Sequence, residues 1–292
     1  MRVTSNVKRP IIRYHGGKWK LAPWIVENMP KHNVYVEPFG GGANVLLRKP
    51  RVAAEVYNDL DTRVVAVFRA LRDPETAEKI RRRLSLTPFA RAEFDSCYEK
   101  SDDQVEEVCK TIMLSFMGHG TDSITRSCRT GFRAKMSDGR ATPAQPWATY
   151  WEAIDSYVER LRGVVIEQRE AAEVMLRMDT RDSLFFVDPP YVTSTRSSLN
   201  RRSSATHGYR HEMTDEDHQR LAAILRDLRG MVMLCGYHSD LYDGLYGDWQ
   251  RIERESLADG AKKRTECLWF NDAAWRRRPQ MELMKREDRT CA

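Results

Sequence analysis

Residues 34–47 read VYVEPFGGGANVLL, an apolar run followed by a glycine-rich turn and then by a helical pattern. A second unit of the same kind comes next: residues 53–57 predict a strand, Asn58-Asp59 a turn, and the apolar spacing through Leu71 a helix. Two consecutive strand–turn–helix units are typical of a parallel sheet with crossover helices. This part of the chain therefore predicts an α/β fold.

Four further apolar runs predict the rest of the sheet, at residues 163–166, 184–187, 231–235 and 266–270. The run 184–187 contains no charge, which favours a strand that is buried on both faces. A helix is expected over residues 214–228. Thr214 has the position of an N-cap with Asp217 three residues later, and one face is apolar, formed by Leu221, Ile224, Leu225 and Leu228.

The middle of the chain, residues 73–162, differs from the parts on either side of it. Its apolar spacing is helical and strand patterns are absent, with the clearest helices expected over 102–117 and 147–161. We therefore predict one α/β domain, residues 1–72 and 163–292, interrupted by a helical insert, residues 73–162.

The composition is that of a globular protein, with 292 residues of which 41% are hydrophobic and 31% charged. No apolar run approaches the ~18 residues that a membrane span needs, and residues 1–10 lack the apolar core of a secretory signal. The six cysteines and seven histidines show no disulfide or metal spacing. We expect a cytoplasmic protein with no bound metal and no contact with membranes.

The net charge of +6 favours a polyanionic partner. Basic residues gather in residues 1–20, in the polar stretch 118–140 and in residues 193–211. Arginine suits bidentate contacts to phosphate and to bases, and the predicted contacts are Arg126, Arg129, Arg133 and Arg202. The alternative is an arginine-rich but merely solvated surface.

Asp188-Pro189-Pro190-Tyr191 directly follows the charge-free run. Two prolines end the strand and hold the backbone rigid, and ligands of parallel sheets bind at this end of the strands. The Asp188 carboxylate and the Pro189 carbonyl can each accept one hydrogen bond from an exocyclic NH2 group, while Tyr191 stacks on the ring. The motif predicts a receptor for a planar amine; the alternative is a strand that simply ends at two prolines.

Three other motifs predict a nucleoside site. The glycines of Glu37-Pro38-Phe39-Gly40-Gly41-Gly42 fit neither a dinucleotide fingerprint nor a P-loop, which suits a nucleoside that lacks a pyrophosphate. Asp59 is placed to accept the hydroxyls of a ribose, and Gly16-Gly17-Lys18 brings a cation to the site. The alternatives are an ordinary glycine turn, a solvated turn and a flexible basic terminus.

The motifs Tyr14-His15-Gly16-Gly17-Lys18, Glu37–Gly42, Asn58-Asp59-Leu60-Asp61 and Asp188–Tyr191, in this order, resemble the Dam-like DNA N6-adenine methyltransferases of the D12 class. The similarity spans most of the chain, and residues 264–271 resemble phage and prophage members. The resemblance implies a Rossmann-like methyltransferase sheet with a helical target-recognition insert, S-adenosylmethionine as the methyl donor, S-adenosylhomocysteine as the product, and site-specific methylation of adenine in double-stranded DNA.

The resemblance also implies roles for individual residues. Catalysis falls to Asp188, Pro189 and Tyr191, and donor binding to Tyr14, Lys18, Glu37, Phe39, Gly40, Gly41, Gly42, Asp59 and Asp188. The chain departs from the family pattern in having Tyr14 where tryptophan is frequent, His15 where a small residue is usual and Asp61 where asparagine is usual. The base-contacting residues of the insert are not recognisable, so recognition of GATC is not predicted.

Alternatives within the same fold are an N4-cytosine methyltransferase or an RNA amine methyltransferase, because the receptor accepts any planar exocyclic amine. A protein-glutamine methyltransferase would more often carry asparagine at the position of Asp188. An alternative of another class is a non-catalytic DNA-binding protein that masks sites. We expect a monomer in solution, with a dimer on DNA as the alternative.

Overall fold

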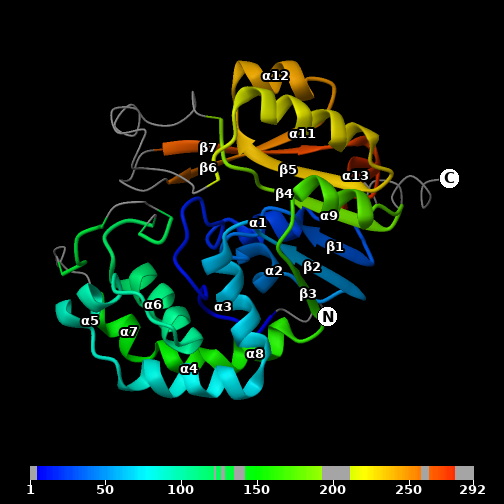
Figure 1. The fold of residues 1–292 in the computed structure, drawn as a ribbon. Helices are drawn as coiled ribbons and strands as arrows, with labels where there is room; N and C mark the ends of the chain where they lie inside the picture. The colour runs from blue at the N-terminus through cyan, green and yellow to red at the C-terminus, as the bar shows by residue number, and fades with distance from the viewer. Residues whose placement is uncertain are drawn as a thin grey trace.

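The computed structural model describes residues 5–121, 123–125, 129–134, 142–192, 211–257 and 263–279. Within these residues, seven strands form one sheet in the order β3-β2-β1-β4-β5-β7-β6 (Figure 1). Strands β1 to β5 pair in parallel, and β7 runs antiparallel to β5 and β6. The strands are β1 Val34–Glu37, β2 Ala54–Asn58, β3 Val164–Glu167, β4 Ser183–Val187, β5 Met231–Tyr237, β6 Gln250–Leu257 and β7 Lys263–Phe270.

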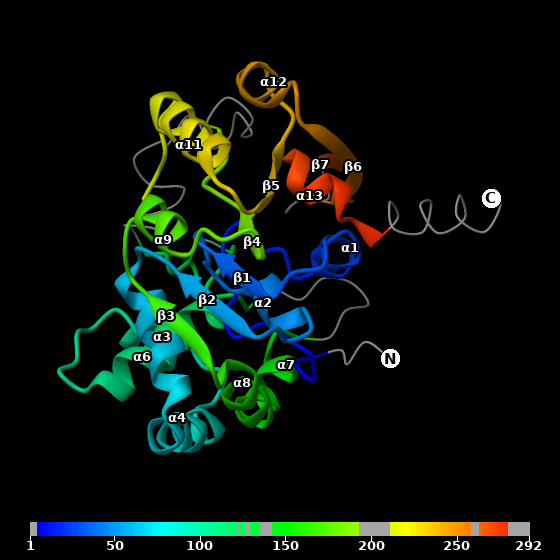
Figure 2. The same ribbon diagram turned by 90° about the vertical axis from the view of Figure 1, so that its right-hand side faces the viewer.

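Helices cover both faces of the sheet (Figure 2). Alternate side chains of a strand point to opposite faces, so in β4 Leu184 and Phe186 enter one apolar cluster, the first core, while Phe185 and Val187 enter the second core. The second core is completed by α9 Ala171–Arg177, α11 Asp215–Asp227 and α12 Asp240–Tyr246. Burial on both faces explains why the strand contains no charge.

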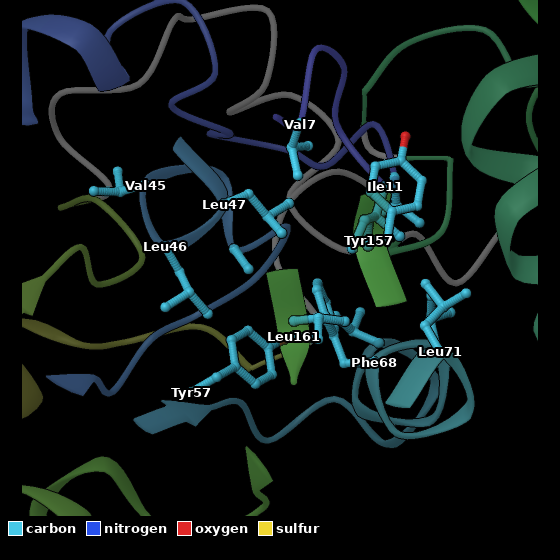
Figure 3. Packing of buried hydrophobic residues seen from close by; sticks show 14 of the residues in the cluster. Val7, Ile11, Val45, Leu46, Leu47, Tyr57, Phe68, Leu71, Tyr157 and Leu161 are labelled. Atoms are coloured by element: carbon cyan, nitrogen blue, oxygen red, sulfur yellow. The ribbon is translucent and has the colours of Figure 1, made fainter. Parts of the chain in front are cut away.

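The first core joins segments that are far apart in the sequence (Figure 3). Ile11 of the N-terminal segment packs in the same cluster as Leu46, Phe68 and Leu161. Helices α1 Ala22–Glu27, α2 Asn44–Arg48, α3 Thr62–Arg72 and α13 Asp272–Arg276 of the sheet domain contribute to it.

The described residues of the region 73–162 are mainly helical, as predicted. Its helices are α4 Pro74–Leu86, α5 Arg91–Ser96, α6 Gln104–Met117, α7 Ala144–Ala148, the 3-10 helix η1 Tyr150–Ala153, and α8 Ile154–Leu161. The helix expected over 147–161 is therefore divided into three pieces. The side chains there are anchored to different segments: Trp147 donates to the Thr87 carbonyl and Tyr150 to the Ile11 carbonyl.

This helical region shares its core with the sheet domain. Ile80 of α4, Ile112 of α6 and Leu161 of α8 are buried in the first core together with Phe68 of α3. A buried ion pair adds to the connection, since Arg160 of α8 bonds both carboxylate oxygens of Glu55 in β2, at 2.6 and 2.9 Å. The region packs on the sheet domain through a continuous apolar cluster.

The α/β sheet, with six of its seven strands at the predicted places, and the capped helix α11 confirm the sequence-based predictions. Thr214 and Asp217 form a capping box at the start of α11. Strand β6 was not predicted, because it is an edge strand whose residues 250–255 are mostly exposed and therefore lack an alternating apolar pattern. Among the described residues, no helix has the length and apolar character needed to cross a bilayer.

Candidate active site

The four motifs meet in one pocket of about 540 Å³ at the carboxyl ends of the parallel strands. The first motif lies in the N-terminal segment, and each of the other three follows a different strand. Parallel strands bring their carboxyl ends to the same edge of a sheet. The motif residues that line the pocket are Tyr14, His15, Gly16, Gly17, Lys18, Glu37, Pro38, Phe39, Gly40, Gly41, Gly42, Asn58, Asp59, Leu60, Asp188 and Pro190.

The glycine turn after β1 is packed between two aromatic rings. A Cβ atom at Gly40 would overlap the ring of Tyr57, and one at Gly41 would lie 2.6 Å from the ring of Tyr14. Gly41 also has a φ of 46°, a conformation that favours glycine. The hydroxyl of Tyr57 donates to the Gly41 carbonyl at 2.8 Å. The turn therefore needs glycine at both positions, because the two tyrosine rings leave no space for a side chain there.

Asp59 joins the turn after β2 to the glycine turn. Its Oδ2 accepts a hydrogen bond from the Gly41 N–H at 2.7 Å, and its Oδ1 accepts one from the Asp61 N–H at 2.8 Å. Burial raises the pKa of Asp59 above its ordinary value, and the two backbone donors oppose that shift. Each carboxylate oxygen keeps a further lone pair that can accept a hydroxyl.

Glu37 lies beneath the glycine turn, where its side chain is buried. Its Oε2 accepts hydrogen bonds from the hydroxyl of Tyr35 at 3.0 Å and from the N–H of Leu46 at 3.1 Å. Burial raises the pKa of Glu37 to about 8, although both hydrogen bonds act in the opposite direction. This carboxyl group ties β1 to α2 at the floor of the pocket.

Asp188 forms an ion pair with Lys18. The Lys18 Nζ lies 2.9 Å from Asp188 Oδ2 and donates to the Gly16 carbonyl at 2.7 Å. The same ammonium lies 4.7 Å from the centre of the Tyr191 ring. Burial raises the pKa of Asp188, and the charge of Lys18 lowers it in part. A carboxylate with this environment is a strong hydrogen-bond acceptor that faces the pocket.

Tyr191 lies beside the pocket and does not line it, and the same holds for Pro189. The Tyr191 side chain is 7% exposed, and the ring of Tyr237 meets it edge-on at 4.6 Å between centroids. Its hydroxyl donates to Glu266 Oε2 of β7 at 2.8 Å. Glu266 was not predicted as a site residue; its one signal in the sequence is its acidic side chain at the start of the apolar run 266–270.

Two further groups of lining residues were also not predicted. Glu170, Ala171 and Ala172 follow β3, a fourth strand whose carboxyl end reaches the pocket. The other group comes from α11 and the residues before it, and consists of His211, Glu212, Met213, Asp217, Arg220, Leu221 and Ile224. The helix was predicted, but part of the apolar face expected to pack in the core also lines the pocket.

The predicted DNA contacts are only partly within the described residues. The Arg129 guanidinium stacks on the ring of Tyr98, 4.4 Å from its centre, and lies 3.6 Å from Asp95 Oδ1. Arg133 follows the bridge between Gly118 and Phe132 and donates its backbone N–H to the Met117 carbonyl at 2.7 Å. Arg126 and Arg202 lie outside the described residues.

The sheet order, with its antiparallel seventh strand, and the pocket at the carboxyl ends of the parallel strands, with Asp188 at the end of β4, place the protein in the Rossmann-like α/β class. Comparison with known families matches residues 14–259 to the D12 class N6 adenine-specific DNA methyltransferases, and the chain belongs to this family. It is similar to the Type II methyltransferase M.MjaIII of Methanocaldococcus jannaschii, with 26% identity over 271 residues that cover 82% of this chain and 88% of the relative.

Proposed function

We propose that the pocket binds S-adenosylmethionine and that Asp188 and the Pro189 carbonyl receive the N6 amine of an adenine flipped out of double-stranded DNA. The observation that carries this proposal is the position of the Asp188 carboxylate, which faces the pocket formed by the glycine turn and Asp59. Asp188, one of the two acceptors of the proposed receptor, thus lines the same cavity as the proposed donor site.

The residues present fit the donor. The cavity of about 540 Å³ is within the usual range for small-molecule sites. The glycines of the turn line the cavity without side chains of their own, and Asp59 offers lone pairs suited to ribose hydroxyls. The proposed donor contacts are Tyr14, Lys18, Glu37, Phe39, Gly40, Gly41, Gly42, Asp59 and Asp188.

S-adenosylmethionine supplies an electrophilic methyl group on a sulfonium ion. The chain's task is to make the amine nucleophilic, because the amine lone pair is delocalised into the adenine ring. Hydrogen bonds from both amine hydrogens to Asp188 and to the Pro189 carbonyl localise that lone pair and orient it. Alignment contributes much of the rate, and two fixed acceptors add electrostatic stabilisation. The surplus proton leaves the amine after transfer, so Asp188 need not be a strong base.

A base inside a duplex is out of reach of this pocket, so the target must be flipped out at a cost of a few kcal/mol. We propose that Tyr191 offsets part of this cost by stacking on the base. Since the Tyr191 side chain is 7% exposed, a face of its ring must first become accessible. We further propose that residues 73–162 form the target-recognition domain and that Arg129 and Arg133 contact DNA.

We also propose that the protein is of phage or prophage origin, that it is a monomer in solution and that it is located in the cytoplasm. An N4-cytosine or RNA amine substrate would use the same receptor, and the family match favours adenine.

The proposal is tested with Asp188→Ala, assayed by transfer of labelled methyl groups to unmethylated DNA. We expect methylation to be lost while S-adenosylmethionine still binds, because Asp188 is one contact among several. Asp182→Ala is the matched control, since that carboxylate is 61% exposed and pairs with Arg277. Full activity of Asp188→Ala would refute the proposal. Single-molecule sequencing of DNA from expressing cells identifies the modified base and its sequence context.

A further inference from the structure

Glu266 occupies an unusual position for an acidic residue. Strand β7 lies between β5 and β6 (Figure 1), and its side chains alternate, so that Leu268 and Phe270 enter the first core while Cys267 and Trp269 enter the second. Glu266 continues the row of Leu268 and Phe270 and is 5% exposed. Burying a carboxylate among apolar side chains costs free energy unless it is hydrogen-bonded. The group that bonds to Glu266 therefore indicates what this residue does.

That partner is the hydroxyl of Tyr191, which donates to Glu266 Oε2 at 2.8 Å. The thiol of Cys235 lies 3.8 Å from the same oxygen. Hydrogen bonds to an ionised acceptor are roughly twice as strong as those between neutral groups. Glu266 therefore holds the far end of the tyrosine ring in place.

The contact extends to the proposed catalytic carboxylate. The ring of Tyr191 carries the Lys18 ammonium 4.7 Å from its centre, and that ammonium lies 2.9 Å from Asp188 Oδ2. Tyr237, the β5 residue paired with Glu266 in the sheet register, meets the same ring edge-on. A continuous series of contacts thus runs from β7 through Tyr191 and Lys18 to Asp188.

We propose that Glu266 is a positioning residue for methyl transfer, which fixes the Tyr191 ring through its hydroxyl and thereby sets the place of Lys18 and Asp188. The inference rests on the proposed roles of Asp188 and Tyr191. A positioning role requires that Glu266 affects the rate through the Tyr191 hydroxyl, whereas a purely structural role does not.

The test is a double-mutant cycle on the single-turnover rate of methyl transfer, using Glu266→Leu, Tyr191→Phe and the double variant with unmethylated plasmid DNA. We expect Glu266→Leu to lower the rate about tenfold, as loss of a charge-assisted hydrogen bond does. The double variant should be no slower than the slower single variant, because the two changes remove the same interaction. Additive losses would overturn the proposal.

Two variants and one binding measurement separate this role from simple misfolding. Glu266→Gln keeps an acceptor for the hydroxyl and should retain most of the rate; a loss as large as that of Glu266→Leu would refute anchoring by a hydrogen bond. Glu253→Leu is the matched control, since Glu253 lies in β6, pairs with Arg251 and is 44% exposed. Its rate should be unchanged.

The affinity for S-adenosylmethionine, measured by calorimetry, should be the same in Glu266→Leu as in the unmodified chain, because Glu266 does not line the pocket. A fall in donor affinity that parallels the fall in rate would indicate a general structural role and overturn the proposal. An active Asp188→Ala would refute the proposed function, whereas additive losses beside an inactive Asp188→Ala would refute only the role of Glu266.

Discussion

The ammonium of Lys18 lies 2.9 Å from the carboxylate of Asp188, and the Lys18 side chain is 4% exposed. Lys18 comes from the N-terminal segment and Asp188 from the end of β4, so the pair ties the first motif to the fourth. Because both groups lie at the pocket, the pair sets the charge of the proposed amine receptor. Its strength should be visible in the pH dependence of methylation.

Replacing Lys18 with methionine should move the acid limb of kcat/KM to higher pH. Asp188 accepts the amine hydrogens best as a carboxylate, so activity falls as the pH drops through its pKa. Burial raises the pKa of Asp188, and Lys18 lowers it; without Lys18 the pKa rises further. The measurement is the pH profile of methyl transfer, with Lys31→Met as an exposed control. An acid limb that stays in place would contradict the expected role of the ion pair.

Glu37→Gln should remove a pH dependence of stability. The pKa of Glu37 is raised from 4.5 to about 8, so between these values the folded chain keeps a proton that the unfolded chain releases. The free energy of unfolding therefore falls as the pH rises through this window and falls no further above it. Glutamine does not titrate.

The stability of Glu37→Gln relative to the unmodified chain should thus be greater at pH 9 than at pH 5, by more than about 1 kcal/mol. Urea unfolding at the two pH values measures this difference. Exposed Glu75→Gln serves as the control and should follow the unmodified chain at both. An equal difference at pH 5 and pH 9 would show that Glu37 is not protonated by burial.

Gly40→Ala should weaken donor binding and destabilise the fold by roughly 1–3 kcal/mol, as overpacking does. The new Cβ would overlap the Tyr57 ring, whose hydroxyl holds the Gly41 carbonyl, so the turn must shift. Gly244→Ala is the control, because nothing lies within 4 Å of a Cβ there and alanine favours helix α12. Thermal melts with and without S-adenosylmethionine report both effects; a Gly40→Ala chain that binds normally would count against the turn as the donor site.

Arg160→Met should destabilise the chain by roughly 1–3 kcal/mol, since it removes one of the two cations of the buried Glu55 carboxylate and the donor to the Leu46 carbonyl. Arg160 bonds both oxygens of Glu55 and the Leu46 carbonyl at 2.6 Å, and Lys49 shares the same carboxylate at 2.6 Å. Arg162→Met is the control, because Arg162 is 71% exposed and should change stability by less than about 0.5 kcal/mol. Urea unfolding distinguishes the two; equal effects would mean that the buried cluster does not stabilise the fold.

Arg129→Ala should weaken DNA binding across sequences. The slope of the logarithm of the binding constant against the logarithm of the salt concentration should become shallower by about one. The guanidinium is 62% exposed and is held in place by Tyr98 and Asp95. Arg276→Ala, which removes an exposed arginine paired with Asp272, is the control and should leave the slope unchanged. The measurement is the dissociation constant of duplex DNA at several salt concentrations, and an unchanged slope for Arg129→Ala would exclude a phosphate contact there.

The local pattern of the chain was sufficient to predict most of the sheet. The apolar runs at 184–187 and before the glycine turn identified β4 and β1, because a strand buried on both faces is apolar over several consecutive residues. Edge strand β6 escaped prediction for the opposite reason: its stability comes from hydrogen bonds to β7, and its own side chains are mostly exposed.

The motif residues that line the pocket were predicted from the sequence, since three of the four motifs follow a strand and strand ends are local features. The tertiary structure decided which side chains meet. Glu266 reaches Tyr191 because β7 inserts between β5 and β6 in an antiparallel register, and Leu221 and Ile224 line the pocket because α11 packs beside it. Strand order and helix placement minimise the free energy of the whole core, so no short stretch of sequence determines them.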